Sequence, residues 1–429
     1  MFTPENLEVL LVSFEGPDEY SQAGGLGVRM TDMSRALAAL GFRTTLAFVG
    51  SPGEPADEER DGVRLIRWCQ ELSRRSPGGV YDGQEAKIRE LCVSLPDHLI
   101  DRVVRPAVGA GRVVAILFEE WQLADVCHLM TARLTQARLR QSCMLLWNAN
   151  NFFGFGEIDW AALGRAAAIT TVSRYMKQLM RAHGVNPIVI PNGIAVSALQ
   201  PVDGGAVEEI RQASGTPCLA FKIGRFSRDK CWHQAVSAIA RLRADGVPAR
   251  LLMRGDRGPF GAEVVRHATT LGLEVAEWER PIADCHGIAQ ALRDSGTAPV
   301  VNLRIFLPAP VIPEIAAAAT AVLANSGHEP FGLVGLETMA AGGVAVVGST
   351  GEEYARPYGN AVVIETDDAA ELASALLGLV ERPELSRRLR EAARRDASDF
   401  VWSQVIEGLM ERLRYVCTQQ GVTAPAAAP

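Results

Sequence analysis

Short apolar runs alternate with helical patterns along most of this 429-residue chain, and this alternation limits the fold more than any other feature. Residues 9–14 have the continuous apolar character of a buried parallel strand. A glycine-rich turn follows, then apolar residues at helical spacing over 30–40, then a second strand pattern at 44–49. This strand–turn–helix–strand order predicts a doubly wound parallel sheet.

The same alternation resumes after a turn-rich segment at 191–205. At 429 residues the chain is too long for one hydrophobic core and fits two domains of about 200 residues each. We therefore expect two facing Rossmann-like α/β domains, residues 1–197 and 198–398, with a ligand cleft between them. Residues 419–429 are rich in alanine and proline, and we expect a disordered tail there.

Composition argues against several classes of function. The formal net charge of −7 argues against nucleic acid as the main partner, since binding to backbone phosphates usually needs a basic surface. The eight cysteines form no CxxC pair or other metal spacing, which indicates reduced thiols in a cytoplasmic protein without a metal site. We also expect no signal peptide and no membrane span, because no apolar run approaches the ~20 residues that cross a bilayer.

The segment from His328 to Glu337 has the strongest functional pattern. Two carboxylates, Glu329 and Glu337, stand eight positions apart around a glycine turn, between a strand pattern at 321–324 and a helical pattern at 336–341. The start of such a helix favours phosphate, and a carboxylate one turn later can accept hydrogen bonds from a ribose. The alternative is a pair of ordinary surface acids, which a helix start attracts by its dipole alone.

Two further loops follow strand patterns. Residues 224–230 place Arg225 and Lys230 at the carboxyl end of a strand, where a guanidinium fork and an ammonium together suit a diphosphate. The alternative is a solvated basic loop. Gly24 and Gly25 follow the first strand and can let backbone N–H groups approach an anion or a sugar. They do not form a GxGxxG pattern, and the alternative is a tight turn.

Together these motifs resemble the retaining GT-B glycosyltransferases, in the branch that contains glycogen, starch and sucrose synthases. Six segments match in family order: 23–27, 119–124, 171–173, 191–194, 224–230 and 328–337. The resemblance implies the GT-B fold, in which a C-terminal helix, here 399–418, crosses back to the N-terminal domain. It also implies that residues 1–197 bind the acceptor and residues 198–398 bind the nucleotide sugar.

The resemblance assigns roles position by position. Arg225 and Lys230 would bind the donor diphosphate and stabilise the charge of the leaving group, and Glu329 would contact hydroxyls of the donor sugar. Glu337 would hold the ribose, and no metal is required. The implied catalytic residues are Arg225, Lys230 and Glu329. The implied donor-binding residues are Gly24, Gly25, Asn148, Phe331, Gly332, Leu333 and Glu337.

Three positions depart from the family pattern. Asn148 stands where relatives have a sugar-contacting histidine, and an amide can bond to a hydroxyl but cannot carry a proton at neutral pH. Glu119 and Glu120 stand where a His-Asp pair is common, and Cys231 replaces a glycine. These departures predict a specialised acceptor.

The expected reaction is retaining transfer of a hexosyl group, with glucosyl favoured, from a UDP- or ADP-sugar to a hydroxyl acceptor such as a sugar or glucan. The nucleotide sugar is a co-substrate, and no other cofactor is expected. One alternative is an epimerase or hydrolase acting on a nucleotide sugar, and another is a non-catalytic nucleotide-sugar-binding relative. A membrane-associated enzyme that glycosylates a lipid is less favoured, because Pro106 should break any long amphipathic helix near the arginines at 102–112.

Overall fold

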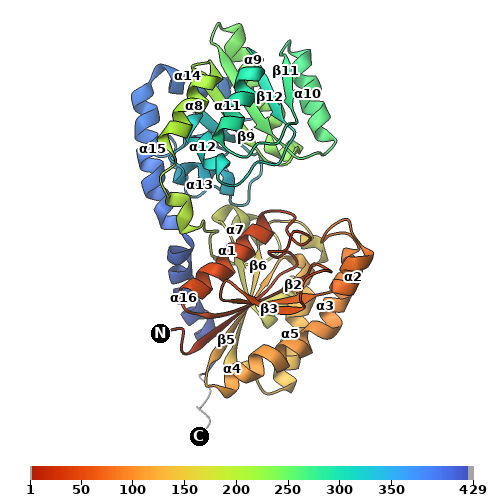
Figure 1. Ribbon diagram of the computed structural model, residues 1–429. Coiled ribbons are helices and arrows are strands. Elements are labelled where there is room, and N and C mark those ends of the chain that lie inside the picture. Colours follow the sequence, from red (N-terminus) through yellow and green to blue (C-terminus); the bar gives the residue numbers. More distant parts are fainter. Residues whose placement is uncertain (1, 424–429) are drawn as a thin grey trace. The chain divides into compact units, whose positions relative to one another are not determined.

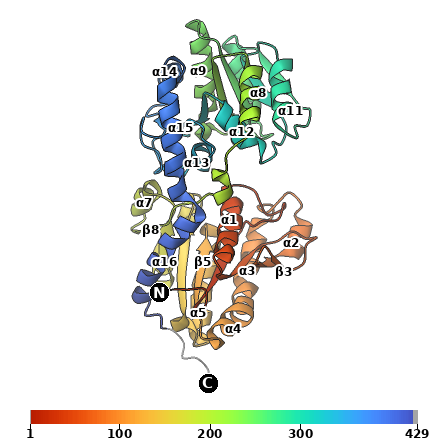
Figure 2. The same ribbon diagram turned by 60° about the vertical axis from the view of Figure 1, so that its left-hand side comes forward.

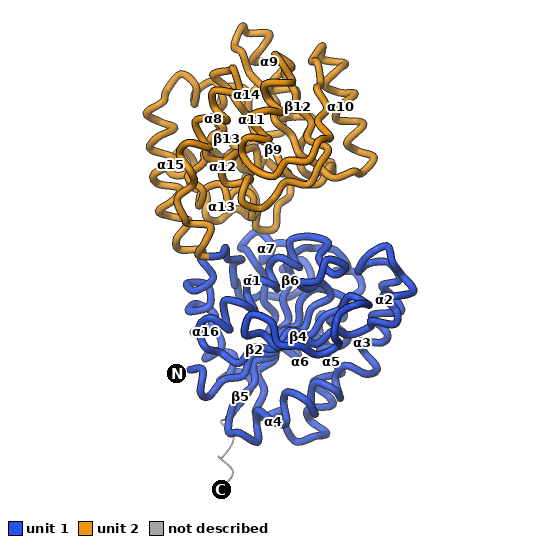
Figure 3. The backbone as a smooth tube through the Cα atoms, in the orientation of Figure 1, with its two compact units in different colours: residues 1–195, 401–429 blue, residues 196–400 orange. Residues whose placement is uncertain are grey.

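The computed structural model describes residues 2–423, which form two compact units (Figures 1 and 3). Unit 1 takes the described residues up to Ala195 together with those from Val401 onward, and unit 2 takes Val196–Phe400. The chain therefore leaves unit 1 for the whole of unit 2 and then returns to it.

Unit 1 is built on one eight-stranded sheet in the order β3-β4-β2-β1-β5-β6-β7-β8. Neighbouring strands are parallel except for β3 and β4, which pair antiparallel at one edge. The strands are β1 (Leu7–Val12), β2 (Arg43–Val49), β3 (Asp57–Arg60), β4 (Val63–Trp68), β5 (Val113–Glu119), β6 (Cys143–Ala149), β7 (Ala168–Thr171) and β8 (Ile188–Val189).

Helices cover both faces of this sheet (Figures 1 and 2). They are α1 (Gly25–Ala39), α2 (Gln70–Arg75), α3 (Gln84–Leu99), α4 (Arg105–Gly109), α5 (Ala124–Gln136), α6 (Trp160–Ala166), α7 (Arg174–Arg181) and the returning α16 (Trp402–Gln419). Helices α1 and α16 lie side by side over one face, where they cover Leu7, Val9 and Leu11 of β1. These alternate positions of β1 point to the same side of the sheet, as the period of a strand requires.

Pro106 does not break the helical run that contains it, contrary to the sequence expectation. Helix α3 continues through a π-helical turn at Ile100–Val104 directly into α4, and Pro106 lies at the start of α4. Proline has no N–H to donate to the preceding turn, and it is tolerated here because the wider π turn lies directly before it and α4 begins at this point. Even so, within residues 2–423 no helix combines the length and apolar character needed to cross a membrane.

Unit 2 is built on a seven-stranded, wholly parallel sheet in the order β11-β12-β10-β9-β13-β14-β15. Its strands are β9 (Cys218–Ile223), β10 (Ala249–Arg254), β11 (Val275–Trp278), β12 (Val300–Leu303), β13 (Ala321–Ala324), β14 (Ala345–Val347) and β15 (Val362–Val363). Its helices are α8 (Gly204–Ser214), α9 (Trp232–Ala244), α10 (Phe260–Thr270), α11 (Cys285–Asp294), α12 (Val311–Ala318), α13 (Leu333–Ala340), α14 (Ala369–Glu381) and α15 (Pro383–Ala397).

Both units reverse their strand order next to their first strand. In unit 1 the reversal lies between β1 and β5, and in unit 2 it lies between β9 and β13. The predicted fold class, two doubly wound parallel sheets, is confirmed. Ligands of such sheets bind outside the carboxyl ends of the strands at the reversal, so each unit has one favoured place for a site.

The described part of the expected tail packs on unit 1. The side-chain amide of Gln420 accepts a hydrogen bond from the backbone N–H of Leu145 and donates one to its carbonyl, at 3.0 and 2.8 Å. Val422 is buried in the same core as α1 and α16. Residues 424–429 of the expected tail lie outside the described residues.

Because α16 supplies part of the core of unit 1, truncating its buried face should destabilise that unit. Leu409 is 1% exposed, and we expect Leu409→Ala to lower the free energy of unfolding of unit 1 by about 3 kcal/mol. Tyr415→Ala on the same helix, where the side chain is 57% exposed, is the matched control and should change stability little. Chemical denaturation measures both, and equal effects of the two variants would contradict this packing.

Candidate functional site

Two residues about a hundred positions apart meet at the strand-order reversal of unit 2. Lys230 ends the 3-10 turn between β9 and α9, and Glu329 follows β13. Strands β9 and β13 are parallel neighbours, with Ala220 beside Ala321, so the loops after them leave the same edge of the sheet. The Lys230 ammonium forms an ion pair with Glu329 Oε2, and both side chains are partly exposed. A ligand at this edge can therefore reach both charges.

Arg225 lies on the same loop as Lys230. Its backbone carbonyl accepts a hydrogen bond from Trp232 Nε1 at 2.8 Å, which fixes the loop against the start of α9. Its side chain is exposed and, among the described residues, makes no hydrogen bond or ion pair. The guanidinium is thus available to an anion beside the Lys230–Glu329 pair.

The turn before α13 depends on a glycine. Gly332 has φ +79°, and a Cβ added there would lie 2.8 Å from Cγ of Glu352 and 3.1 Å from Cγ of Glu329. Phe331 beside it is buried against Tyr354, whose hydroxyl donates a hydrogen bond to the Gly332 carbonyl. The turn therefore brings bare backbone close to Glu329, and Gly332 offers no capping side chain to α13.

Leu333 is the first residue of α13, and Glu337 lies one turn further along the same helix with an exposed side chain. The three candidate catalytic residues and the donor residues from Phe331 to Glu337 are therefore gathered in unit 2. The other sequence candidates, Gly24, Gly25 and Asn148, belong to unit 1.

Sequence reasoning missed Glu352, which lies beneath this turn with 5% of its surface exposed. Its Oε2 accepts hydrogen bonds from the backbone N–H and the hydroxyl of Thr350, at 3.1 and 3.2 Å, and its Oε1 has no partner within the described residues. The same Thr350 hydroxyl accepts a bond from the Glu329 N–H at 3.0 Å. Burial, assisted by the nearby charge of Glu329, raises the pKa of Glu352 to about 7.

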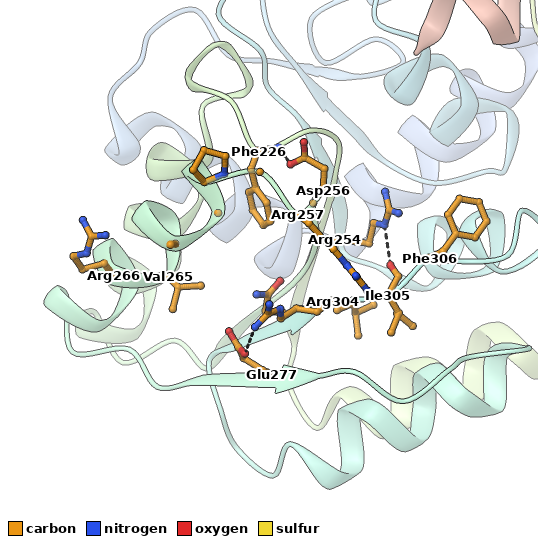
Figure 4. Close-up of a pocket in the computed structure, with 17 residues that line it drawn as sticks. Phe226, Arg254, Asp256, Arg257, Val265, Arg266, Glu277, Arg304, Ile305 and Phe306 are labelled. Atoms are coloured by element: carbon orange, nitrogen blue, oxygen red, sulfur yellow. Dashed lines mark hydrogen bonds and ion pairs between the residues drawn. The ribbon is translucent and has the colours of Figure 1, made fainter. Parts of the chain in front are cut away.

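A cavity of about 890 Å³ lies at the same edge of the unit 2 sheet (Figure 4). It begins at Phe226, the residue after Arg225, and extends past the ends of β10 and β12 to Phe306. Four arginines line it, with acidic, aromatic and amide side chains between them. The polar and aromatic lining residues are Phe226, Arg254, Asp256, Arg257, Arg266, Glu277, Asn302, Arg304 and Phe306.

Hydrogen bonds hold part of this lining in place. Asp256 Oδ1 accepts from the Phe226 N–H at 2.8 Å, and Arg304 pairs with Glu277 at 2.9 Å. Arg254 donates to the Ile305 carbonyl at 3.1 Å (Figure 4). The sequence signal for this cavity is the polar run Arg254-Gly255-Asp256, which comes directly after a strand pattern.

In unit 1 the glycine loop already holds an anion that belongs to the protein. Oε2 of Glu15 accepts hydrogen bonds from the N–H groups of Ala23, Gly24 and Gly27, at 3.1, 2.9 and 3.0 Å. Glu15 is 3% exposed, and its other oxygen accepts a bond from the Tyr81 hydroxyl. The Gly24 N–H, which the sequence offered to a ligand, therefore bonds to an internal carboxylate.

Asn148 is also engaged inside unit 1. It is paired with Glu119 in the β5–β6 register, and its Nδ2 donates to Glu119 Oε2 at 2.8 Å. Its Oδ1 accepts from the Thr170 hydroxyl at 2.8 Å, and only 2% of the residue is exposed. Glu119 also contacts Arg29 and accepts from Asn150 Nδ2 at 2.6 Å. The amide that replaces the family histidine is thus part of a buried network.

Glu120 stands at the carboxyl end of β5, at the strand-order reversal of unit 1. It has φ +75°, which is strained for a residue with a side chain, and it is 3% exposed. Its Oε1 accepts from the Asn150 N–H at 2.8 Å, while Oδ1 of Asn150 has no partner among the described residues. Burial raises the pKa of Glu120 to about 8, so its carboxyl group is protonated at neutral pH.

The internal anion of unit 1 leads to a test by hydrogen exchange. We expect Glu15→Gln to speed exchange of the Ala23, Gly24 and Gly27 amide hydrogens about tenfold, because a neutral amide oxygen is a weaker acceptor than a carboxylate. Glu59→Gln, at an exposed carboxylate of β3, is the control. Unchanged exchange in Glu15→Gln would show that the carboxylate does not hold the loop.

The raised pKa of Glu352 makes stability depend on pH. The folded state holds this proton more tightly than the unfolded chain does. The contribution of Glu352 to the free energy of unfolding is therefore fully present below about pH 4.5 and is lost as pH rises through about 7. We expect Glu352→Gln to be more stable than wild type at pH 8, by at most roughly 3 kcal/mol, and to lose this advantage towards pH 5. Denaturation of the protein at several pH values measures the trend. Glu381→Gln, at an exposed position, controls for loss of a carboxylate, and a pH-independent difference would refute the expectation.

Two family models match the chain. Residues 24–193, in unit 1, match the glycosyl transferase 4-like domain, and residues 296–396, in unit 2, match glycosyl transferases group 1. The GDP-mannose-dependent alpha-(1-6)-phosphatidylinositol dimannoside mannosyltransferase of Mycobacterium tuberculosis (strain ATCC 25177 / H37Ra) is 27% identical over 265 residues. That alignment covers 62% of this chain and 61% of the relative, so the chain spans less than two thirds of that relative's length.

Other similarities extend over nearly the whole chain. The alpha-maltose-1-phosphate synthase of M. tuberculosis (strain ATCC 25618 / H37Rv) is 29% identical, over 96% of this chain and 100% of the relative. The catalytic domain of starch synthase IV from Arabidopsis thaliana, solved bound to ADP and acarbose, superposes with a TM-score of 0.68 at 16% identity, over 97% and 99% of the two chains. The resemblance drawn from the motifs is confirmed: this chain has the GT-B fold and carries glycosyltransferase domains of these two families, the 4-like domain in unit 1 and the group 1 domain in unit 2.

Proposed function

We propose that this glycosyltransferase moves a hexosyl group, with retention, from a nucleotide-diphosphate sugar to a hydroxyl acceptor. The observation that carries the proposal is the Lys230–Glu329 ion pair at the strand-order reversal of unit 2, with the exposed Arg225 guanidinium on the same loop. Two cations and a carboxylate at this edge suit a ligand that joins a diphosphate to a polyhydroxy group.

In the proposed reaction the three charged residues, Arg225, Lys230 and Glu329, act on different parts of the donor. Arg225 and Lys230 bind the diphosphate and stabilise the negative charge that grows on it as the bond between the sugar C1 and the phosphate oxygen breaks. Glu329, which pairs with Lys230 in the structure, accepts hydrogen bonds from hydroxyls of the donor sugar once phosphate oxygens surround the ammonium. The acceptor oxygen bonds to C1 from the same face, and its proton passes to the departing phosphate oxygen.

The cavity that begins at Phe226 supports a place for the nucleoside. A diphosphate held by Arg225 directs the rest of the nucleotide towards this cavity, whose aromatic and arginine side chains suit a planar base. We propose the ADP or UDP form of the donor, with Glu337 on α13 binding the ribose hydroxyls. The ADP bound to starch synthase IV supports a nucleoside diphosphate as a ligand of this fold.

We assign acceptor binding to the carboxyl edge of the unit 1 sheet. Protonated Glu120 can donate a hydrogen bond to an acceptor oxygen, and Oδ1 of Asn150 can accept one from a hydroxyl. A hydroxyl offers both roles at one atom. The side chain of Asn148 is already hydrogen-bonded to Glu119 and Thr170. We therefore expect this edge to bind a different acceptor from that of relatives with a histidine at this position.

Substitution of the ion pair tests the donor assignment. We expect Lys230→Ala and Glu329→Ala each to lower kcat/KM for the nucleotide sugar about 100-fold or more, because each removes a charge that acts on the transferred group. Arg293→Ala breaks an exposed ion pair with Glu209 in the same unit and is the matched control. Turnover by both active-site variants at the wild-type rate would refute the proposal.

Product analysis by mass spectrometry separates transfer from the other enzymatic outcomes. A new glycoside with release of the nucleoside diphosphate supports transfer. Free hexose would indicate a hydrolase, and an isomeric nucleotide sugar would indicate an epimerase. Tight donor binding without turnover across a panel of hydroxyl acceptors would indicate a binding protein.

A further inference from the structure

Lys222 is a buried lysine beneath the loops that carry Lys230 and Glu329. It lies on β9 and is 2% exposed. Its ammonium donates to the Leu323 carbonyl at 3.0 Å and to Asn325 Oδ1 at 2.7 Å, and it lies 5.2 Å from the centre of the Trp232 ring. Both acceptors belong to the end of β13 or to the residue just after it, so this side chain bridges the two strands at the reversal.

The bridge continues through a chain of side-chain amides. Asn325 Nδ2 donates to Gln234 Oε1 at 2.6 Å, and Gln234 Nε2 donates to the Thr366 carbonyl at 2.9 Å and to the Asp368 carbonyl at 3.3 Å. Lys222 thereby links β9, the loop after β13, helix α9 and the segment before α14. Each of these elements borders the loops that hold the candidate donor residues.

An apolar residue could fill this position at lower cost. The ammonium bonds to a carbonyl and an amide rather than to a carboxylate, and burying a charge without an opposite charge is unfavourable. Burial accordingly lowers the pKa of Lys222 to about 7. A costly group at a ligand-binding edge, bonded to the loops that form that edge, points to a role in the site.

We propose that Lys222 is a positioning residue of the donor site, which holds the Glu329 loop against the Lys230 loop and places a positive charge beneath the bound diphosphate. This inference rests on the proposed function. Lys222 is screened from the ligand by these loops, so it acts through Lys230 and Glu329 rather than by contact with the donor.

The position of Lys222 makes donor use depend on pH. The groups that face it are Asp229, Lys230 and Cys231 before α9 and Glu329 after β13, and burial raises the pKa of the Cys231 thiol, so that thiol stays neutral. The β10 neighbour of Lys222 in the sheet is an uncharged methionine. Loss of the Lys222 proton above about pH 7 therefore removes one positive charge from the site, and kcat/KM for the donor should fall there.

The test compares kcat/KM for the nucleotide sugar from about pH 5.5 to about pH 9 in wild type and Lys222→Met. At about pH 6.5 we expect the variant to lose roughly tenfold or more, chiefly through a higher donor KM, and its profile to lose the fall above pH 7. Lys87→Met in unit 1 is the matched control, since Lys87 is fully buried and bonds to the Val80 and Asp82 carbonyls. Glu352→Gln removes the other nearby group with a pKa about 7 and should leave the Lys222 inflection in place.

A folded Lys222→Met protein with the wild-type donor KM and pH profile would overturn the inference while leaving the proposed function intact. If Lys222→Met does not fold, Asn325→Asp replaces it: a carboxylate beside the ammonium should move the inflection to higher pH, and an unmoved inflection would overturn the inference. A wild-type protein that neither binds nor turns over any nucleotide sugar would instead refute the proposed function, and the inference with it.

Discussion

The pairing of β9 with β13 is the constraint on which the site in unit 2 depends. Parallel neighbours with their ends level release their following loops at one edge, and here one loop carries the cations and the other carries Glu329. Each loop buries one aromatic residue, Phe226 in the first loop and Phe331 in the second. The geometry of the loops comes from the strands beneath them and from the side chains, such as Lys222, that connect those strands below the loops.

The glycine turns before α1 in unit 1 and before α13 in unit 2 differ in what their backbone groups bond to. At the start of α1 the N–H groups of Gly24 and Gly27 donate to Glu15, a carboxylate of the same unit. The start of α13 follows Gly332, which has no side chain and whose carbonyl accepts a hydrogen bond from the Tyr354 hydroxyl. An anion approaching unit 1 would compete with a resident carboxylate in a buried position, whereas unit 2 offers the exposed guanidinium of Arg225. This difference supports the proposal that the donor phosphate binds to unit 2.

The sequence predicted features that depend on local pattern. Apolar runs and the glycine-containing turns between them located the core strands. The doubly wound order of these strands is enough to place the loops of Lys230 and Glu329 at the same edge of a sheet. What it could not predict depends on partners distant in the chain. The engagement of Asn148 follows from the β5–β6 register that sets it beside Glu119. The burial of Glu352 depends on the packing of the 331–333 turn above it, which no local pattern records.

The buried ionisable groups follow one logic. Glu120, Lys222 and Glu352 each have a pKa moved towards neutrality by burial, and each lies at the carboxyl edge of a sheet. Stability alone would favour apolar residues at all three places, because an uncharged core has no desolvation penalty. All three groups, with their desolvation penalties, lie at the edges where ligands of doubly wound sheets bind. Near neutral pH such groups change charge with little free energy, so a bound diphosphate or hydroxyl can set their protonation as it binds.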